Sequence, residues 1–372
     1  MPATCERRVR GLYAVVPAGG AGTRLWPLSR ANNPKFLLDL AGTGRSLLQE
    51  TFARLRPLVG ADRIVVVTGA SHAEGVSAQL SELTPANLLL EPTPRDSTAA
   101  IGLAAAVLVR RDPEATVGSF AADHVIADTA AFEAAVLEAV ATAEAGYVVT
   151  VGVQPTYAAT AYGYIESGTS LGVDGAASAL AVKRFVEKPD AETAAGYLRR
   201  GVFRWNAGMF VARADVLLNH LARHQPQLYD GISEIADAWE RQDRDDVMAR
   251  RWPALTRIAI DYAIAEPVAA EGGFAVIPAD IGWDDIGDVV ALAGILGGPG
   301  GVQILGDRSQ VLTVDSTGLV AQHGSRTVSL LGVRDVAVID TDDAVLVTTM
   351  ADSQRVKDLV SRWRERGRAD LL

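Results

Sequence analysis

The chain has 372 residues, 49% of them hydrophobic, which is enough to bury at least one large core. Its 35 basic and 45 acidic residues give a formal net charge of −10, which argues against a nucleic-acid surface or an anionic membrane as the partner. Cys5 is the only cysteine, so no intramolecular disulfide can form, and its polar surroundings speak against a catalytic or metal-ligand role.

Residues 1–10 read as a charged N-terminal tail. No apolar segment of the signal-peptide type follows this tail, and no apolar run approaches the length of a membrane span. By elimination, we expect a cytoplasmic protein.

Residues 11–296 alternate short apolar runs with helix-like stretches, a pattern typical of an α/β fold with a mostly parallel sheet. Strands are expected at 13–16, 64–68, 88–91, 116–121 and 147–153, and helices at 46–56, 72–83, 97–110 and 130–145. Residues 155–290 are less regular and contain a Gly/Ser/Ala-rich loop at 167–178. Ligands in such sheets bind where parallel strands end, so one crevice could collect the residues that follow these strands.

The Gly/Pro cluster at 297–301 marks the clearest boundary in the chain. Beyond it, residues 302–372 consist of short Val/Leu/Ile runs separated by turn residues, which predicts a small all-β module followed by a terminal helix at about 353–366. No residue of this module matches a catalytic motif. We therefore expect it to pack on the larger part or to form a subunit contact, leaving the substrate site complete without it.

A turn of small residues follows the first expected strand and contains Gly19, Gly20 and Gly22, followed by Thr23. Glycines let the backbone approach a ligand closely, and exposed N–H groups in such a turn can bind phosphates. Arg24 and Lys35 supply positive charge nearby, so a polyphosphate is the expected ligand. The spacing fits neither a P-loop nor the Rossmann dinucleotide fingerprint, and an ordinary glycine-rich turn is the alternative.

The residues from Gly19 to Ser29, followed by Pro34 and Lys35, resemble the signature of the sugar-nucleotide pyrophosphorylases. Within that superfamily, the stretch from Trp26 to Ser29 is similar to the variant found in mannose-1-phosphate guanylyltransferases. The resemblance implies a Rossmann-like mixed sheet and transfer of GMP from GTP to α-D-mannose 1-phosphate, with GDP-mannose and pyrophosphate as products. Arg24 and Lys35 would then stabilise the leaving phosphates.

The resemblance also implies a Mg²⁺ site formed by two carboxylates that lie far apart in the chain. Asp123 follows an apolar strand, where an isolated Asp more often caps a turn, and it resembles the family's metal-binding Asp-His element. Asp285 occupies the family's second metal position, whereas the role of its neighbour Asp284 is left open. His124 is interpreted as structural, because a phosphate nucleophile needs no proton removed.

Four residues match elements that bind the sugar phosphate in the resembled family: Gly163, Glu187, Lys188 and Asn206. On the residues alone, an adjacent Glu–Lys pair is usually solvated surface. Asp261 fits the guanylyltransferase pattern without an assigned role.

The stretch from Glu91 to Ser97 is the candidate for reading the guanine base, with Glu91 and Arg95 as its nucleotide-binding residues. A carboxylate can accept the N1–H and N2–H₂ donors of guanine. This chain departs from the family pattern at residues 97–99, which leaves the individual base contacts undecided.

Three alternatives accompany this interpretation. The chain could be a nucleotidyltransferase that uses dTTP, UTP or ATP with glucose 1-phosphate, or a non-catalytic homologue that binds GDP-mannose. A bifunctional enzyme with phosphomannose isomerase activity is rejected, because the region after residue 300 offers only His323 as a histidine ligand. A homo-oligomer, most plausibly a dimer, is the expected assembly.

Overall fold

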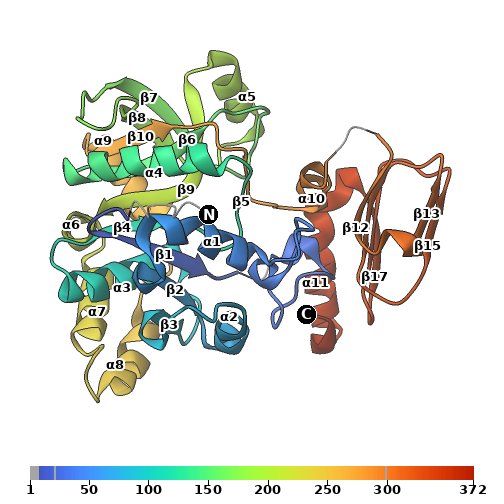
Figure 1. Ribbon diagram of the computed structural model, residues 1–372, viewed down its shortest axis with the longest axis horizontal. Coiled ribbons are helices and arrows are strands. Elements are labelled where there is room, and N and C mark those ends of the chain that lie inside the picture. The colour runs from blue at the N-terminus through green and yellow to red at the C-terminus, as the bar shows by residue number, and fades with distance from the viewer. Residues whose placement is uncertain (1–7, 21, 298–299) are drawn as a thin grey trace, which may run out of the picture.

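The computed structural model describes residues 8–20, 22–297 and 300–372. Most of the expected N-terminal tail, including Cys5, lies outside these residues. Residues 11–296, called the α/β part below, surround one nine-stranded sheet, and residues 302–372 form a C-terminal module beside it (Figure 1). Among the described residues, no helix has both the length and the apolar character needed to cross a membrane.

The sheet has the strand order β3-β2-β1-β4-β9-β6-β10-β8-β7. Only β8 and β9 run against the other seven strands, so the expected mostly parallel, mixed sheet is confirmed. Its strands are β1 (Leu12–Ala18), β2 (Ile64–Gly69), β3 (Leu88–Glu91), β4 (Thr116–Ser119), β6 (Val148–Val153), β7 (Tyr164–Ser170), β8 (Leu180–Val186), β9 (Phe203–Arg213) and β10 (Phe274–Pro278).

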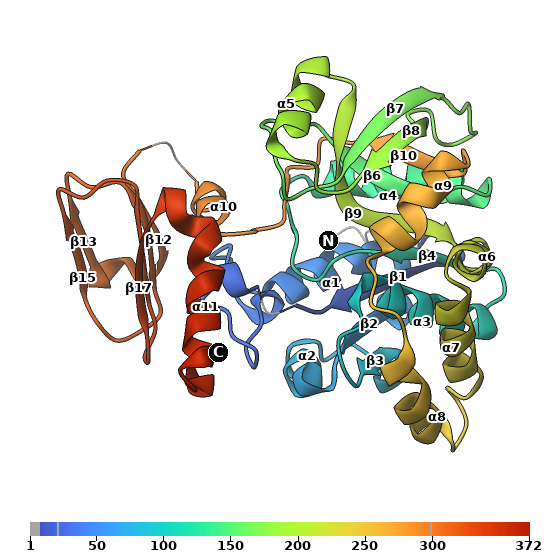
Figure 2. The same cartoon turned by 180° about the vertical axis from the view of Figure 1, so that it is seen from behind.

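Helices cover both faces of the sheet because strand side chains alternate between the two faces. In β1, Val15 joins the core beneath α3, α6 and α7, whereas Ala14 and Val16 join the core beneath α1, α2 and α4 (Figures 1 and 2). The helices of the α/β part are α1 (Leu47–Val59), α2 (Ala73–Gln79), α3 (Asp96–Arg111), α4 (Thr129–Glu144), α5 (Ala191–Arg200), α6 (Ala214–His224), α7 (Pro226–Asp237), α8 (Arg244–Arg251), α9 (Glu266–Ala270) and α10 (Val289–Ile295).

Local signals explain where several elements begin. Helix α1 starts with a capping box, in which the Ser46 hydroxyl accepts from the Gln49 amide and the Gln49 side chain accepts from the Ser46 amide.

Two sequence expectations need correction. The loop expected at 167–178 begins as strand β7, and β10, which lies between β6 and β8, was not predicted because its short apolar run lies in an irregular region.

The C-terminal module is a stack of parallel strands, so the expected all-β module is confirmed. Strands β12 (Val302–Gly306), β14 (Gly318–Gln322) and β16 (Val336–Asp340) pair in parallel, as do β13 (Val311–Val314) and β15 (Val328–Leu331). Strand β17 (Val345–Thr349) closes the stack antiparallel to β16, and α11 (Val356–Glu365) lies between the strands and the α/β part (Figure 1).

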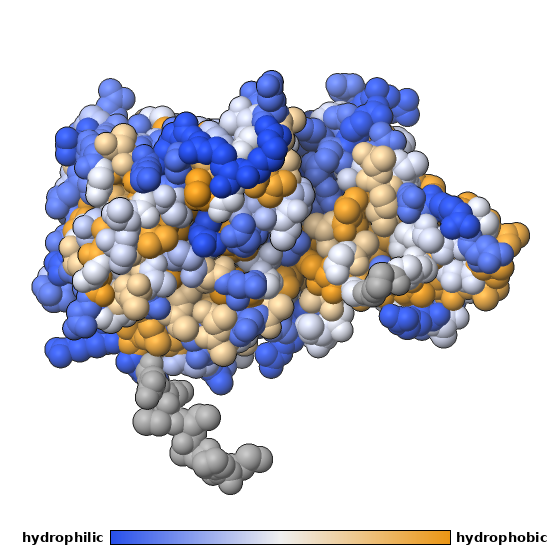
Figure 3. All heavy atoms as spheres, turned by 90° about the horizontal axis from the view of Figure 1, so that it is seen from above, coloured by the Kyte–Doolittle hydropathy of each residue, from blue (hydrophilic) through white to orange (hydrophobic). Residues whose placement is uncertain are grey.

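The two faces of the module differ. At its outer end, Leu312 and Leu331 of the β13–β15 pair are 65% and 76% exposed, and apolar residues are visible at the right-hand end of the molecule in Figure 3. Its inner side joins a hydrophobic core with the segment that follows β1, including Leu25, Trp26 and Leu28. The expectation that the module packs on the larger part is therefore confirmed.

Candidate active site

The glycine turn follows β1 at the edge of the sheet where the parallel strands end. Gly20 and Gly22 have φ angles of +91° and +64°, a backbone region that glycine adopts without strain. A Cβ atom on Gly22 would come within 2.8 Å of the Cβ of Lys35, so only glycine lets these two segments approach so closely. Gly19, Gly20 and Thr23 are exposed, which leaves this part of the turn open to a ligand.

Lys35 contacts both of the residues that the resemblance assigned to one metal site. Its ammonium contacts Asp123 Oδ2 at 2.7 Å and donates to the backbone carbonyl of Asp285. Burial raises the pKa of Asp123, but the charge of Lys35, its hydrogen bond and the other contacts of the carboxylate together outweigh this effect and hold the pKa below its usual range. The structure thus brings Asp123 and Asp285 to the same cation.

A small antiparallel sheet explains why two distant segments meet here. Strand β5 (Val125–Ile126) begins two residues after Asp123, and β11 (Trp283–Asp284) ends directly before Asp285. The two strands pair through Trp283 with Ile126 and Asp284 with Val125. Their hydrogen bonds fix the spacing of the two carboxylates, which sequence separation alone does not reveal.

Local geometry distinguishes Asp285 from Asp284. Asp284 Oδ1 accepts a hydrogen bond of 2.6 Å from the Ile286 amide, so this carboxylate is used to hold its own turn. Asp285 Oδ1 instead accepts from the Tyr162 hydroxyl at 2.9 Å. A Cβ atom on Gly287 would lie 3.2 Å from Asp285 Oδ1 and 3.4 Å from Arg24 Nη1, so the missing side chain makes room for both charged groups.

His124 has the surroundings of a structural residue. Its Nδ1 accepts a hydrogen bond of 3.2 Å from the Trp283 indole, and the two rings meet edge to face with centroids 5.5 Å apart. Burial lowers the pKa of His124, which keeps the ring neutral and able to accept this bond. The contact connects β5 to β11 through side chains as well as backbone.

The residues expected to bind the sugar phosphate form a second cluster. The backbone N–H of Asn206 donates to the Gly163 carbonyl at 2.8 Å. A Cβ atom on Gly163 would come within 2.5 Å of Glu187 Oε2. Lys188 Nζ lies 2.5 Å from Glu187 Oε1. Glu187 is only 6% exposed whereas Lys188 is 57% exposed, so the ammonium is available to a ligand and the carboxylate is held in place.

Asp261 orients Asn206 within this cluster. Its Oδ1 accepts from Asn206 Nδ2 at 2.9 Å, while Asn206 Oδ1 accepts from the Thr150 hydroxyl at 2.7 Å and from the Gly208 amide at 3.1 Å. Three partners therefore determine which way the Asn206 amide faces, and one N–H of Nδ2 is left for another acceptor. Burial, together with the Glu187 charge, raises the pKa of Asp261 to about 7.

Glu91 lies at the same edge of the sheet as the glycine turn, two strands away. Ala18 pairs with Thr68 and Gly69 pairs with Glu91, so β1, β2 and β3 end side by side. Glu91 is 7% exposed, and burial and the charge of Asp96 raise its pKa to about 7. Glu91 Oε1 and the nearby Thr98 Oγ1 have no hydrogen-bond partner among the described residues.

Arg95, the other residue expected at the base, hydrogen-bonds the backbone of a distant segment. Its Nη2 donates to the Pro253 carbonyl at 2.5 Å. In the same region the Trp252 indole donates to the Thr93 carbonyl at 2.7 Å. Arg95 thus helps to attach the loop after β3 to the segment around Trp252.

Residues 13–296 match the nucleotidyl transferase family. The chain belongs to this family. Residues 309–363 match the MannoseP isomerase/GMP-like beta-helix domain, in agreement with the stacked parallel strands of the C-terminal module.

This nucleotidyl transferase has relatives that span almost its whole length. It is 39% identical to the xanthan biosynthesis protein XanB of Xanthomonas campestris pv. campestris (strain B100) and 36% identical to a mannose-1-phosphate guanylyltransferase of Escherichia coli (strain K12), each over 96% of this chain and 74% of the relative. A solved structure from Thermus thermophilus, described as a mannose-1-phosphate geranyltransferase, is 30% identical and has a TM-score of 0.83; the match covers 95% of this chain and 99% of that one.

Two contributors to the site of this nucleotidyl transferase were not predicted. Tyr162 precedes Gly163 in the chain, and its contact with Asp285 depends on a fold that brings residues 123 positions apart together. Gln354, in the C-terminal module, accepts a hydrogen bond of 3.1 Å from Arg24 Nη1. The C-terminal module thus contacts a predicted site residue, whereas the expectation that the substrate site is complete without the module stays a prediction.

Proposed function

We propose that this chain transfers GMP from GTP to α-D-mannose 1-phosphate and releases GDP-mannose and pyrophosphate. The single observation that carries the proposal is the connection between the two clusters of the site. Tyr162 donates to Asp285 in the carboxylate cluster, and the next residue, Gly163, accepts from Asn206 in the sugar-phosphate cluster. A nucleotide on the first cluster and a sugar phosphate on the second would meet at this point.

The reaction is an in-line displacement at phosphorus. A phosphate oxygen of mannose 1-phosphate forms a bond to the α-phosphorus of GTP, while the bond from this phosphorus to the bridging oxygen of the β-phosphate breaks. No proton has to be removed from the nucleophile, which agrees with the structural surroundings of His124. Catalysis then consists of positioning the two substrates and neutralising their charges.

In this proposal the cations are divided between the phosphates of the two substrates. Backbone amides of the glycine turn, together with Arg24 and Lys35, bind the GTP phosphates, and Arg24 faces the charge that grows on pyrophosphate as it leaves. Lys188, which is exposed beside the held Glu187 carboxylate, binds the phosphate of the sugar. Asn206, oriented by Asp261, hydrogen-bonds the sugar hydroxyls.

The donor set at Asp123 and Asp285 fits Mg²⁺, which prefers carboxylate oxygens and substrate phosphates. The Lys35 ammonium already contacts the Asp123 carboxylate and the backbone carbonyl of Asp285, so this position accommodates positive charge. When bound, Mg²⁺ would offset the repulsion between the two phosphate-bearing substrates.

Guanine recognition is assigned to Glu91. Neighbouring strands lie about 4.8 Å apart, so Glu91, two strands from the glycine turn, is roughly 10 Å away from the phosphates, a separation that a nucleoside spans. The unpartnered Oε1 of this buried carboxylate suits the N–H donors of guanine. Arg95, bound to the Pro253 carbonyl, supports the loop in this proposal.

The proposal also covers the roles of the two parts of the chain, the assembly and the location. We assign the transfer reaction to residues 11–296 and a supporting role to residues 302–372. Assembly as a homodimer and a location in the cytoplasm stay predictions.

The decisive experiment measures pyrophosphate release with each of GTP, ATP, UTP, CTP and dTTP, paired with mannose 1-phosphate and with glucose 1-phosphate. The pair of GTP and mannose 1-phosphate should give the highest kcat/KM, and the Asp285→Asn variant controls for a contaminating activity. Equal or higher rates with glucose 1-phosphate would favour the first alternative. Binding of GDP-mannose without pyrophosphate release for any pair would favour the non-catalytic homologue.

A further inference from the structure

The Arg24 guanidinium contacts the C-terminal module. Gln354 belongs to the turn of helix at Met350–Arg355 that precedes α11. Its Oε1 accepts the hydrogen bond of 3.1 Å from Arg24 Nη1. Among the described residues, Gln354 is the one hydrogen-bond partner of the Arg24 guanidinium.

Asp288 determines which way the Gln354 amide faces. Asp288 is 8% exposed, and its Oδ1 caps α10 by accepting from the amides of Val290 at 2.8 Å and Ala291 at 3.0 Å. Its Oδ2 accepts from the Ser353 hydroxyl at 3.2 Å and from Gln354 Nε2. A carboxylate can only accept hydrogen bonds, so the amide nitrogen must face Asp288, and the amide oxygen is left to face Arg24.

Arg24 is held beside the carboxylate cluster by this arrangement. Asp288 is three residues beyond Asp285, and Gly287 lies between them in the chain. The position that a Cβ on Gly287 would occupy is within 3.5 Å of Arg24 Nη1 and of both carboxylate oxygens of Asp285. Gln354 therefore connects the glycine turn, through Arg24, with the turn around Asp285, through Asp288.

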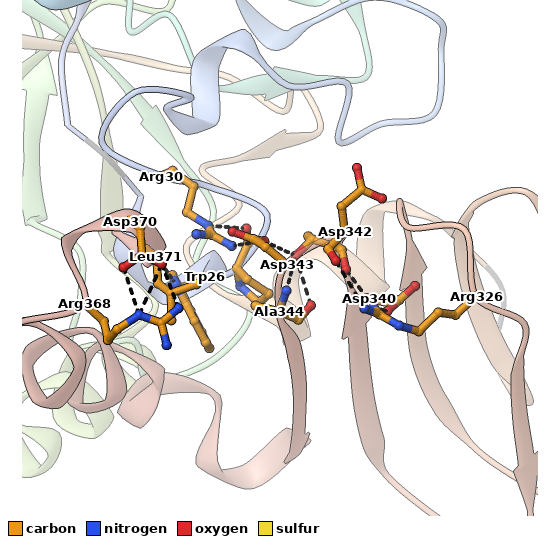
Figure 4. A network of polar contacts seen from close by, with 12 residues as sticks. Trp26, Arg30, Arg326, Asp340, Asp342, Asp343, Ala344, Arg368, Asp370 and Leu371 are labelled. Atoms are coloured by element: carbon orange, nitrogen blue, oxygen red, sulfur yellow. Dashed lines mark hydrogen bonds and ion pairs between the residues drawn. The ribbon is translucent and has the colours of Figure 1, made fainter. Parts of the chain in front are cut away.

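The surrounding contacts keep the module in place at this point. The Trp26 indole donates to the Leu371 carbonyl at 2.6 Å, and Arg30 pairs with Asp343 at 2.8 Å (Figure 4). Val356 and Val360 of α11 are buried in the core that includes Leu25 and Trp26. The exposed hydrogen bond between Arg24 and Gln354 is therefore flanked by apolar and polar contacts that join the module to the α/β part.

We propose that Gln354 is a positioning residue, through which the C-terminal module holds Arg24 where negative charge develops on the leaving pyrophosphate. The proposal rests on the role assigned to Arg24 above. A neutral acceptor suits this task, because it orients the guanidinium without neutralising it. A carboxylate at the same place would compete with pyrophosphate for the charge.

The test uses the full chain and steady-state kinetics with GTP and mannose 1-phosphate. Gln354→Ala should lower kcat about tenfold and leave the KM for mannose 1-phosphate within about twofold, since the lost contact acts on the leaving group. Gln354→Met keeps the length of the side chain without its polar atoms and should give the same loss. It replaces the alanine variant if that variant folds poorly. Asp343→Asn is the matched control: it removes a junction contact away from Arg24 and should keep kcat.

A double-mutant cycle separates this inference from the assignment of Arg24. If Gln354 acts through Arg24, adding Gln354→Ala to Arg24→Ala should change kcat by less than about twofold. Additive losses, or full activity of both Gln354 variants beside an impaired Arg24→Ala, would overturn the positioning role. Normal activity of Arg24→Ala would instead overturn the role of Arg24 on which the inference rests.

Discussion

The clearest test of guanine recognition is the pH dependence of GTP use. Burial and Asp96 raise the pKa of Glu91 to about 7, and only the ionised carboxylate can accept two N–H donors of guanine. For a pKa of about 7, the ionised fraction rises from about 9% at pH 6 to about 91% at pH 8. The KM for GTP should therefore fall about tenfold across this interval.

The assay measures initial rates of pyrophosphate release at saturating mannose 1-phosphate and a fixed excess of Mg²⁺, in half-unit steps of pH. Glu91→Gln supplies the reference. GTP itself changes its protonation in this interval and affects both proteins, whereas the substituted side chain does not titrate, so the variant shows the effect of GTP alone. The ratio of the wild-type KM to the Glu91→Gln KM should therefore fall about tenfold from about pH 6 to about pH 8. Parallel profiles for both proteins would refute the assignment of Glu91 to the base.

The same shift predicts an effect on stability with a defined sign. The folded protein binds the Glu91 proton more tightly than the unfolded chain, whose ordinary value is 4.5. The free energy of unfolding should thus decrease as pH rises from about 4.5 to about 7, by at most about 3 kcal/mol from this group. Chemical denaturation of Glu91→Gln beside the wild type should show a flatter pH profile for the variant.

Three further predictions concern the carboxylate cluster, the cations and the module. Asp285→Asn should lower kcat at least about a hundredfold without changing the melting temperature by more than a few degrees, and near wild-type turnover at saturating Mg²⁺ would remove Asp285 from the site. Lys188→Ala should mainly raise the KM for mannose 1-phosphate, about tenfold or more, whereas Arg24→Ala should mainly lower kcat; the reverse pattern would exchange their roles. A chain ending at residue 297 should lose kcat as well as stability, because it lacks Gln354 and exposes Trp26, and a stable, fully active truncation would contradict this expectation.

Short-range signals in the sequence were sufficient to predict much of the fold. Strand β3 occurs at the expected residues, because an apolar run bounded by turn residues carries its own signal. The glycine turn could be predicted for a similar reason, since Gly20 and Gly22 occupy backbone conformations that depend on the residue itself. Strand β10 escaped prediction, because pairing with β6 and β8 decides its structure.

The tertiary structure decided which of these residues meet. The pairing of β5 with β11 brings Asp123 and Asp285 to Lys35, and the hydrogen bond to the Ile286 amide separates the role of Asp284 from that of Asp285. The contact between Arg24 and Gln354 joins residues 330 positions apart through side chains of no recognisable motif. Such contacts arise from the packing of whole elements, so periodicity and local spacing in the sequence carry no trace of them.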